Sequence, residues 1–394
     1  MDSRTSGMKQ AIELYIHIPF CVRKCNYCDF LSFASDEDTQ EKYVSQLINE
    51  LTFRAALCSD YSVSSVFIGG GTPSIISEKH IADILETIDK NYYIKPDCEL
   101  TIECNPASAM RHKFSAYKKA GINRLSLGLQ SADNAELKVL GRIHTFEDFL
   151  KAYQSARMEG FDNVNVDLIN CFPMQSLKTW KRTLKNVLML KVEHVSVYNL
   201  IVEEGTPFYD MRQRGLLLMP SEEEQTAIDE FTKECMAKYG YERYEFSNYA
   251  KPGHECRHNI GYWSGVPYIG FGLGASSMFE RMRWKNTSSM SGYMNIDFES
   301  DADTVCSGLM TEITALSRED RMSEFVYLGM RLTKGVSATD FRTEFSAQIE
   351  NVFGEQLEKN IGLGLIEYDG DRYRLTERGI DVSNVVLSDF LLEE

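Results

Sequence analysis

The sequence predicts an α/β protein with a partial (βα)6, TIM-like barrel, a lid region and a small C-terminal winged-helix-like α+β domain. From about residue 14 to residue 200, short β-branched runs alternate with longer amphipathic segments, which is typical of βα units around a parallel sheet. Six such units can be drawn, fewer than the eight of a full barrel. The alternation stops near residue 201, where aromatic and glycine-rich stretches begin.

The expected barrel elements follow one another in order. Strands are expected at residues 14–18, 63–68, 99–103, 124–128, 163–169 and 194–200. Helices are expected between them at residues 38–57, 78–90, 114–120, 146–158 and 177–190. We divide the chain into a flexible tail at 1–10, the barrel at 11–215, the lid at 216–305 and the C-terminal domain at 306–394. In such barrels the functional groups lie at the carboxyl ends of the strands.

The first expected strand leads directly into three cysteines, Cys21, Cys25 and Cys28, spaced C-x3-C-x2-C. Thiolates this close together select zinc or an iron–sulfur cluster. A closed zinc site takes four protein ligands, so His17 or Asp29 would have to be the fourth. Three thiolates on a four-iron cube would instead leave one iron open to a substrate or cofactor. The spacing alone also fits three reduced, buried thiols.

The next four expected strands also end at unusual motifs. Three glycines and Thr72 follow the second strand, Glu103 ends the third, Gln130 follows the fourth, and Asp167 lies near the end of the fifth. Glycines let a backbone approach a ligand closely, although a glycine-rich turn alone is as often only the connection between a strand and a helix. Because the carboxyl ends of parallel strands meet at one edge of the sheet, these five strand ends predict a single site.

The cysteine spacing, the strand before it and the aromatic residue before the third cysteine resemble the radical S-adenosylmethionine (radical SAM) superfamily. The resemblance implies a [4Fe-4S] cluster held by Cys21, Cys25 and Cys28. It also implies that the amino and carboxylate groups of SAM chelate the fourth iron, and that the glycine-rich segment contacts the SAM amino group.

The chain is similar, more closely, to the family of coproporphyrinogen III dehydrogenases and haem chaperones, HemN and HemW. That family has a glutamate after the third strand, a glutamine in Gly-x-Gln-Ser, an arginine twelve residues later and an aspartate in Asn-x-Asp-Leu-Ile. The SAM site that the resemblance implies consists of Tyr15, Tyr27, Gly70, Gly71, Thr72, Glu103, Gln130, Arg142 and Asp167. These residue types suit SAM, because its cationic groups favour carboxylates, its own carboxylate favours an arginine, and its ribose hydroxyls need an acceptor.

The lid region departs from the βα rhythm, and we expect it to cover the open side of the barrel. It contains His258-Asn-x-x-Tyr262-Trp263, the H-N-x-x-Y-W motif that marks the haem-chaperone branch of the family. Histidine is a common axial haem ligand and aromatic rings can flank a porphyrin, so His258, Tyr262 and Trp263 are haem candidates. His254 and Cys256 are competing ligands. The three motif residues can equally be packed structural residues that hold the lid.

The last section is expected to form three helices and a β-hairpin around Asp369-Gly370, similar to a winged helix. Residues 318–394 hold nine Lys or Arg against sixteen Asp or Glu, which is the wrong sign for contact with phosphates. The whole chain carries a formal charge of −16. We therefore expect no nucleic-acid partner, and a domain that covers the substrate opening, as the resemblance implies.

The composition predicts a soluble, cytoplasmic protein. The 394 residues, 43% of them hydrophobic, can bury one large core and a smaller second one. No stretch approaches the roughly 18 apolar residues that span a bilayer, and the polar start has no secretory h-region. Any membrane contact would be peripheral and through a partner. We expect the ten cysteines to be reduced rather than paired in disulfides.

Three functions remain open. The first is a haem chaperone that binds the cluster, SAM and haem, and delivers haem to acceptor proteins such as respiratory haem proteins. The second is an oxygen-independent coproporphyrinogen III dehydrogenase, which converts propionates to vinyls in porphyrin biosynthesis. The third is a noncatalytic cluster- or zinc-binding regulator.

Two departures from the dehydrogenase pattern favour the chaperone. Those enzymes resemble one another in a further cysteine, C-x3-C-x2-C-x-C, where this chain has Phe30. They also have a longer segment before the first strand, which this chain reaches after about a dozen residues. The sequence leaves open whether the protein is an enzyme that cleaves SAM, how it assembles, and which acceptor it serves.

Overall fold

The computed structural model describes residues 9–392. The expected tail at residues 1–10 therefore lies almost wholly outside the described residues, and Gln10 already begins β1 (Gln10–Ile18). The next strands are β2 (Tyr61–Gly70), β3 (Ile94–Cys104), β4 (Arg124–Gln130), β5 (Val164–Asn170) and β6 (His194–Asn199). Each pairs in parallel with the next, which confirms the α/β, partial-barrel fold class.

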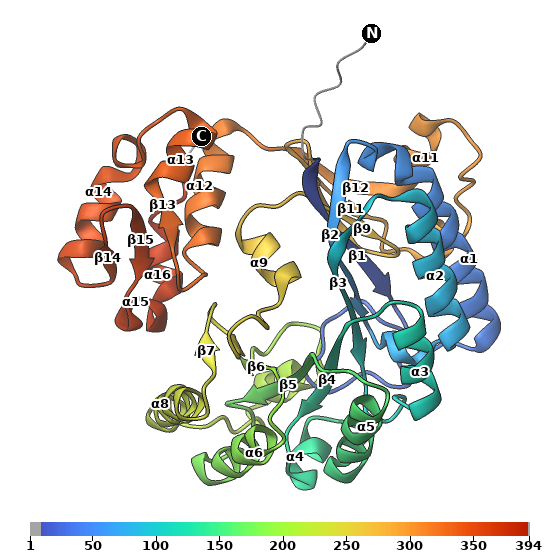
Figure 1. Cartoon of the computed structure of the whole chain (residues 1–394). Coiled ribbons are helices and arrows are strands. Elements are labelled where there is room, and N and C mark those ends of the chain that lie inside the picture. The colour runs from blue at the N-terminus through green and yellow to red at the C-terminus, as the bar shows by residue number, and fades with distance from the viewer. Residues whose placement is uncertain (1–8, 393–394) are drawn as a thin grey trace.

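Helices cover the outer face of this sheet (Figure 1). They are α1 (Glu37–Arg54), α2 (Glu78–Asn91), α3 (Arg111–Lys119), α4 (Asn134–Val139), α5 (Phe146–Met158) and α6 (Leu177–Met189). The six-residue α4 was not expected, because one and a half turns carry no readable periodicity. Apolar side chains such as Ile68, Leu127 and Val166 are buried between the strands and the helices. Burial on both faces explains why the strands read as apolar runs.

The described residues build one twelve-stranded sheet, ordered β12-β11-β10-β9-β1-β2-β3-β4-β5-β6-β8-β7. The additional strands are β7 (Glu242–Arg243), β8 (Asn248–Ala250), β9 (Tyr268–Phe271), β10 (Ser276–Phe279), β11 (Met282–Asn286) and β12 (Met310–Ala315). The accompanying helices are α7 (Pro207–Gln213), α8 (Glu222–Lys238), α9 (Arg257–Trp263), α10 (Met290–Met294) and α11 (Ala302–Leu309). Much of the expected lid thus extends the two edges of the sheet, and α9 lies on the open side between them (Figure 1).

The C-terminal section forms a separate domain with its own core (Figure 1). Its helices are α12 (Arg318–Gly329), α13 (Ala338–Phe345), α14 (Ile349–Gly362), α15 (Glu377–Asp381) and α16 (Ser383–Ser388), and its strands are β13 (Val336–Ser337), β14 (Ile366–Tyr368) and β15 (Arg372–Leu375). The expected wing forms at Asp369-Gly370 between β14 and β15. The expected boundary at residue 306 falls inside α11, because β12 still pairs with β11.

No helix among the described residues combines the length and the apolar character needed to cross a bilayer.

Candidate cofactor site

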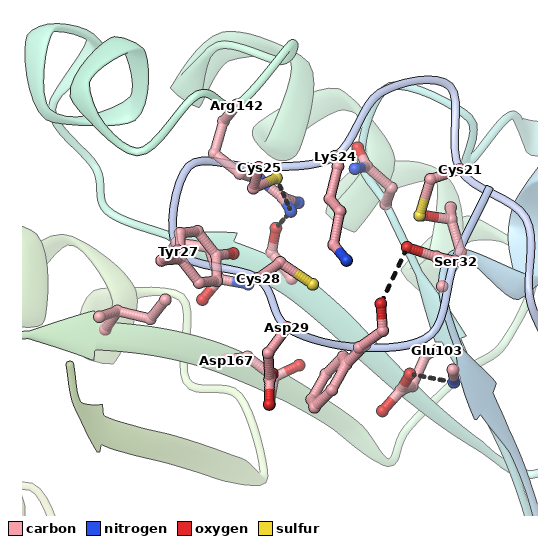
Figure 2. A pocket seen from close by; sticks show the side chains of 18 of the residues that line it. Cys21, Lys24, Cys25, Tyr27, Cys28, Asp29, Ser32, Glu103, Arg142 and Asp167 are labelled. Carbon is pink, nitrogen blue, oxygen red and sulfur yellow. Dashed lines mark hydrogen bonds between the residues drawn. The ribbon is translucent and has the colours of Figure 1, made fainter. Parts of the chain in front are cut away.

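A cavity of about 400 Å³ opens at the carboxyl ends of the barrel strands. The predicted residues that line it are Cys21, Cys25, Tyr27, Cys28, Gly70, Gly71, Thr72, Glu103, Gln130, Arg142 and Asp167. Figure 2 shows the labelled members of this set around one space. Tyr15, the remaining predicted SAM contact, is not among the residues that line the cavity, and its hydroxyl lies 3.0 Å from Nδ1 of His17.

The Cys loop (residues 21–32) is tied at both ends and in the middle. Cys21 N donates to the carbonyl of Phe33, and Phe33 N donates to the carbonyl of Pro19, which closes the loop at its base. At its middle, Asn26 Nδ2 donates to the carbonyl of Val139, the last residue of α4, over 2.9 Å. The loop sequence therefore presents its three thiols from a fixed backbone.

The three thiols face the cavity among polar neighbours. Cys21 Sγ lies 3.3 Å from the Thr72 hydroxyl, and Arg142 Nη1 donates to Cys25 Sγ over 3.6 Å. Burial raises the pKa of Cys28 to about 11, and the nearby thiolates of Cys25 and Cys21 act in the same direction. A thiol that resists ionisation among other thiols requires a cation or metal to become a thiolate ligand.

The donor set fits a cluster better than a single ion. Within residues 9–392, no group of three His, Cys, Asp or Glu side chains is close enough to hold one metal ion. A single tetrahedral zinc would need its ligand atoms all within about 2.3 Å of one point, whereas a cube spreads its thiolates over separate irons. Gly71 packs directly under the Cys loop, because a Cβ there would lie 3.0 Å from Cys21 Sγ and 2.7 Å from the Phe20 carbonyl oxygen.

The glycine turn and Glu103 form a second side of the cavity. Gly70 adopts φ 115°, a conformation that other residues avoid, and its N–H donates to Glu103 Oε2 over 3.2 Å. Burial raises the pKa of Glu103 to about 8, and the charge of Asp167 adds to this. A cationic group in the cavity would offset both effects, so this side of the site suits an ammonium or sulfonium.

Arg142 supplies the positive side of the cavity. Its Nη2 donates to the carbonyl of Gly128 over 2.8 Å, while its buried Nε has no hydrogen-bond partner in the described part of the chain. Beside it, Gln130 adopts a left-handed backbone with φ 71°, which is costly for a residue other than glycine. The under-used guanidinium can bind a ligand carboxylate.

Asp167 lies on the floor of the cavity and is oriented by two neighbours. Ser126 Oγ donates to its Oδ2 and Asn165 Nδ2 donates to its Oδ1, both over 2.8 Å. The carboxylate can still accept hydrogen bonds from the cavity, because each oxygen has two lone pairs.

The three haem candidates on α9 do not line this cavity. His258 is 2% exposed, its Nδ1 lies 2.7 Å from the Ser65 hydroxyl, and its ring stacks on Phe67. Tyr262 packs edge-on against His258, and Trp263 lies under the guanidinium of Arg331, 4.2 Å from its ring centre. This geometry matches the structural alternative for the motif.

The two competing haem-ligand candidates, Cys256 and His254, lie at or just before the start of α9. Cys256 is fully buried, and its Sγ lies 3.4 Å from Oε1 of Glu99. His254 is half-buried beside it in the loop before α9. Neither residue lines the cavity at the strand ends.

Sequence reasoning missed part of the rim of the cavity. Arg23, Lys24 and Asp29 in the Cys loop line it, and Figure 2 shows Lys24 pointing inward. Tyr198 near the end of β6, and Leu200 and Ile201 just after it, line the cavity as well. The rule that selected the first five strand ends also applied to the sixth, and it would have found this segment.

Comparisons with known proteins match nearly the full length of the chain. Residues 15–187 match the radical SAM superfamily, and residues 316–382 match the HemN C-terminal domain. The protein described as Heme chaperone HemW from Lactococcus lactis is 33% identical over 381 residues, which covers 96% of this chain and 97% of that protein. The proteins of the same description from Bacillus subtilis and Escherichia coli are also 33% identical, and cover 99% and 98% of their own lengths.

A solved structure has the same fold. Coproporphyrinogen III oxidase (HemN) from Escherichia coli, described as a radical SAM enzyme, superposes with a TM-score of 0.83 at 23% identity. The match covers 97% of this chain and 90% of that one. At this identity the likeness establishes the fold alone.

Proposed function

Because the chain belongs to the family of the Heme chaperone HemW proteins, within the radical SAM superfamily, we propose that it is a haem chaperone. It binds a [4Fe-4S] cluster, SAM and haem, and delivers haem to acceptor haem proteins. The observation that carries the proposal is one continuous cavity, which is lined by three thiols, by oppositely charged side chains and by the exposed apolar side chains of Phe30 and Ile201. Its ten cysteines are free, which suits work in the reducing cytoplasm.

The base of the cavity supplies the groups that the two cofactors need. Cys21, Cys25 and Cys28 would hold the cluster, whose bound form supplies one-electron chemistry. Arg142 would bind the carboxylate of SAM, since its guanidinium has an unused N–H. Glu103 would bind a cationic group, and Asp167 would accept from the ribose hydroxyls.

We place haem at the rim of the same cavity. Phe30 and Ile201 both line it and are 61% and 69% exposed, so a large apolar ligand in the cavity could cover them. A porphyrin has two apolar faces that would bury them. Lys24 and Arg23 line the same mouth, and their charges suit the two propionates.

The alternative site at α9 is less accessible. His258 is buried under Phe67 and Tyr262, and its Nδ1 is occupied by Ser65. Its pKa is lowered to about 3 by burial and by the charge of Arg124, so the ring is a neutral, packed group. Haem could reach it only after α9 separated from the barrel.

The test is a haem titration of the cluster-loaded protein under anaerobic conditions, followed by absorbance. We expect one haem per chain. The double variant F30A/I201A should weaken binding at least about a hundredfold, because each truncation removes roughly 1.5–3 kcal/mol of apolar burial. Val22, also 61% exposed in the Cys loop but outside the cavity lining, provides the control, and V22A should bind as wild type.

The same titration separates the two haem sites. Unchanged binding in F30A/I201A together with a lost haem spectrum in H258A would place haem on α9. For the cofactors, the triple variant C21A/C25A/C28A should contain no iron or sulfide after reconstitution. Conversion of coproporphyrinogen III to protoporphyrinogen in the presence of SAM and reductant would instead support the dehydrogenase.

A further inference from the structure

A directed chain of hydrogen bonds runs from the cavity floor through the interior of the barrel. Asn165 Nδ2 donates to Asp167 Oδ1 over 2.8 Å, and His194 Nδ1 lies 2.7 Å from Asn165 Oδ1. On its other side, His194 Nε2 lies 2.9 Å from the hydroxyl of Tyr244. The chain thus joins β5, β6 and the loop between β7 and β8.

The chemistry of each group fixes the direction of these bonds. The oxygen of Asn165 can only accept, so His194 must carry its proton on Nδ1 and donate to it. Nε2 is then an acceptor, and the Tyr244 hydroxyl donates to it. Every bond in the chain therefore donates toward Asp167.

His194 also determines which way the Asn165 amide faces. If that amide rotated by half a turn, its oxygen would face the Asp167 carboxylate, and two acceptors would oppose each other. The N–H of His194, helped by Ser196 Oγ at 3.2 Å, holds the amide oxygen away from Asp167. His194 is 0% exposed, so water offers no substitute donor.

The far end of the chain belongs to two elements outside the barrel. The hydroxyl of Tyr244 accepts from Cys256 N, just before α9, over 3.3 Å. The backbone carbonyl of Tyr244 accepts from Thr333 N over 3.0 Å, and Thr333 follows α12 in the C-terminal domain. Next to this contact, Glu245 and Leu332 form an antiparallel bridge. Tyr244 therefore lies where α9 and the C-terminal domain meet the barrel.

We propose that His194 is a positioning residue that orients Asp167 through Asn165 and links SAM binding to the seating of α9 and the C-terminal domain. The inference rests on the proposed SAM site. When SAM occupies the cavity and binds Asp167, the chain becomes more rigid, and the segments that meet at Tyr244 open less often. The same link makes the C-terminal domain favour the SAM-bound state, because coupling between two sites is reciprocal.

The first test measures SAM affinity of the cluster-loaded protein by equilibrium dialysis. H194L removes the donor to Asn165 and should weaken SAM binding about tenfold, the effect of losing one oriented buried hydrogen bond. H194N can still donate from the position of Nδ1, so it should restore affinity to within about threefold of wild type. Equal loss of affinity in both variants would overturn the proposal, because a purely structural role would treat them alike.

A double variant tests whether the effect passes through Asp167. D167N should weaken SAM binding, and H194L/D167N should be no weaker than D167N alone, since the positioned group is already missing. Full additivity overturns the role of His194. Unchanged affinity in D167N overturns the proposed role of Asp167 in the SAM site, and with it this inference.

The link to the distant segments has its own readout, hydrogen exchange with and without SAM. SAM should slow exchange at the Cys256 and Thr333 amides in the wild-type protein, and this protection should be lost in H194L. Y244F, which keeps the ring and removes the hydroxyl, serves if H194L does not fold, and should also lose the protection at Thr333. Undiminished protection in the folded variant would overturn the link.

Discussion

The barrel interior has two ends, a structural end beneath α9 and a ligand end at the cavity, and each has a glutamate with a different role. On β3, Glu99 and Glu103 are four residues apart and therefore point to the same face of the strand. Glu99 accepts from Cys256 Sγ and from the N–H groups of Arg257 and His258, at the start of α9. Glu103 accepts from the N–H of Gly70 and is otherwise open to the cavity. The carboxylate at the structural end thus accepts three hydrogen bonds from the protein, whereas the carboxylate at the ligand end accepts one and can accept more from a ligand.

The structural end is also closed by tight packing between α9 and β1. Gly261 on α9 lies against the carboxylate of Glu13, and a Cβ there would collide with both carboxylate oxygens. At the ligand end Gly70 and Gly71 also pack closely, because a Cβ would lie 2.8 Å from the His17 ring at Gly70 and 2.7 Å from a backbone oxygen at Gly71, but here the glycines line the cavity. Glycine thus permits close packing at both ends, and at the ligand end it also brings the backbone to the cavity.

The largest expected effect comes from filling the closed end. G261A should lower the free energy of unfolding by about 3 kcal/mol or more, because the added methyl group overlaps a buried carboxylate. Urea denaturation monitored by circular dichroism measures it. The control is G308A in α11, where a Cβ would make only an ordinary contact with Ile296, and which should be neutral or slightly stabilising. Equal stability of the two variants would contradict this tight packing.

The pH dependence of stability tests the buried carboxyl group of the structural end next. Burial raises the pKa of Glu13 to about 9, so the folded state holds a proton that the unfolded state releases above pH 4.5. Wild type should therefore lose stability as pH rises toward 9, by up to about 1.4 kcal/mol per pH unit. E13Q should show a flatter profile between pH 6.5 and 8.5. E86Q, at an exposed ion pair, is the control, and parallel profiles for all three proteins would refute the assignment.

The two glutamates of β3 give a paired test of smaller size. E99A removes the acceptor at the start of α9 and should destabilise the protein by about 1–3 kcal/mol, with little effect on SAM affinity. E103A should change stability by less than about 1 kcal/mol but weaken SAM binding, since it removes a buried group that is poorly paired without ligand. Thermal unfolding and SAM dialysis measure the two effects. The contrast between the two glutamates is contradicted if both variants lower stability, or both weaken SAM binding, to the same extent.

The smallest effect concerns strain at the ligand end. Q130G should stabilise the protein by up to about 1 kcal/mol, because glycine adopts the left-handed backbone without cost. The same variant should lose SAM affinity, since the side chain that lines the cavity is gone. A matched comparison is S346G, at another left-handed position outside the cavity, which should gain stability with no change in SAM binding. Loss of stability in Q130G would show that its backbone is not strained.

The ligand end could be predicted from the sequence because its signals are local. Three thiols in one loop can be recognised without knowing the fold. Glu103, Gln130 and Asp167 each lie at or near the carboxyl end of a strand, where a barrel places its functional groups. Arg142 came from the family resemblance, since nothing near it in the sequence indicates that it reaches Cys25. Tyr15 illustrates the limit of the approach, because alternation along β1 places it inward without telling how deep it lies.

The structural end could not be predicted, because its contacts join distant segments. His258 reads as a metal or haem ligand until Ser65, Phe67 and Glu13 are known to surround it, and no periodicity of α9 reveals those strands. Since the pKa of Glu13 is raised and that of His258 is lowered, both are uncharged at neutral pH, and their 3.7 Å approach is not an ion pair. The parallel pairing of β9 with β1 is equally invisible locally.

The fastening of the Cys loop at Phe33 and at Val139 changes what metal loading demands of the protein. A loop whose backbone is already held needs little further ordering when iron and sulfide bind. Cluster assembly there would therefore not have to be coupled to folding of the loop, unlike in a zinc finger, which is unfolded without its ion. The empty protein should consequently resist proteases at this loop nearly as well as the loaded one. Damage to the metal centre by oxygen would then be repairable on an intact scaffold.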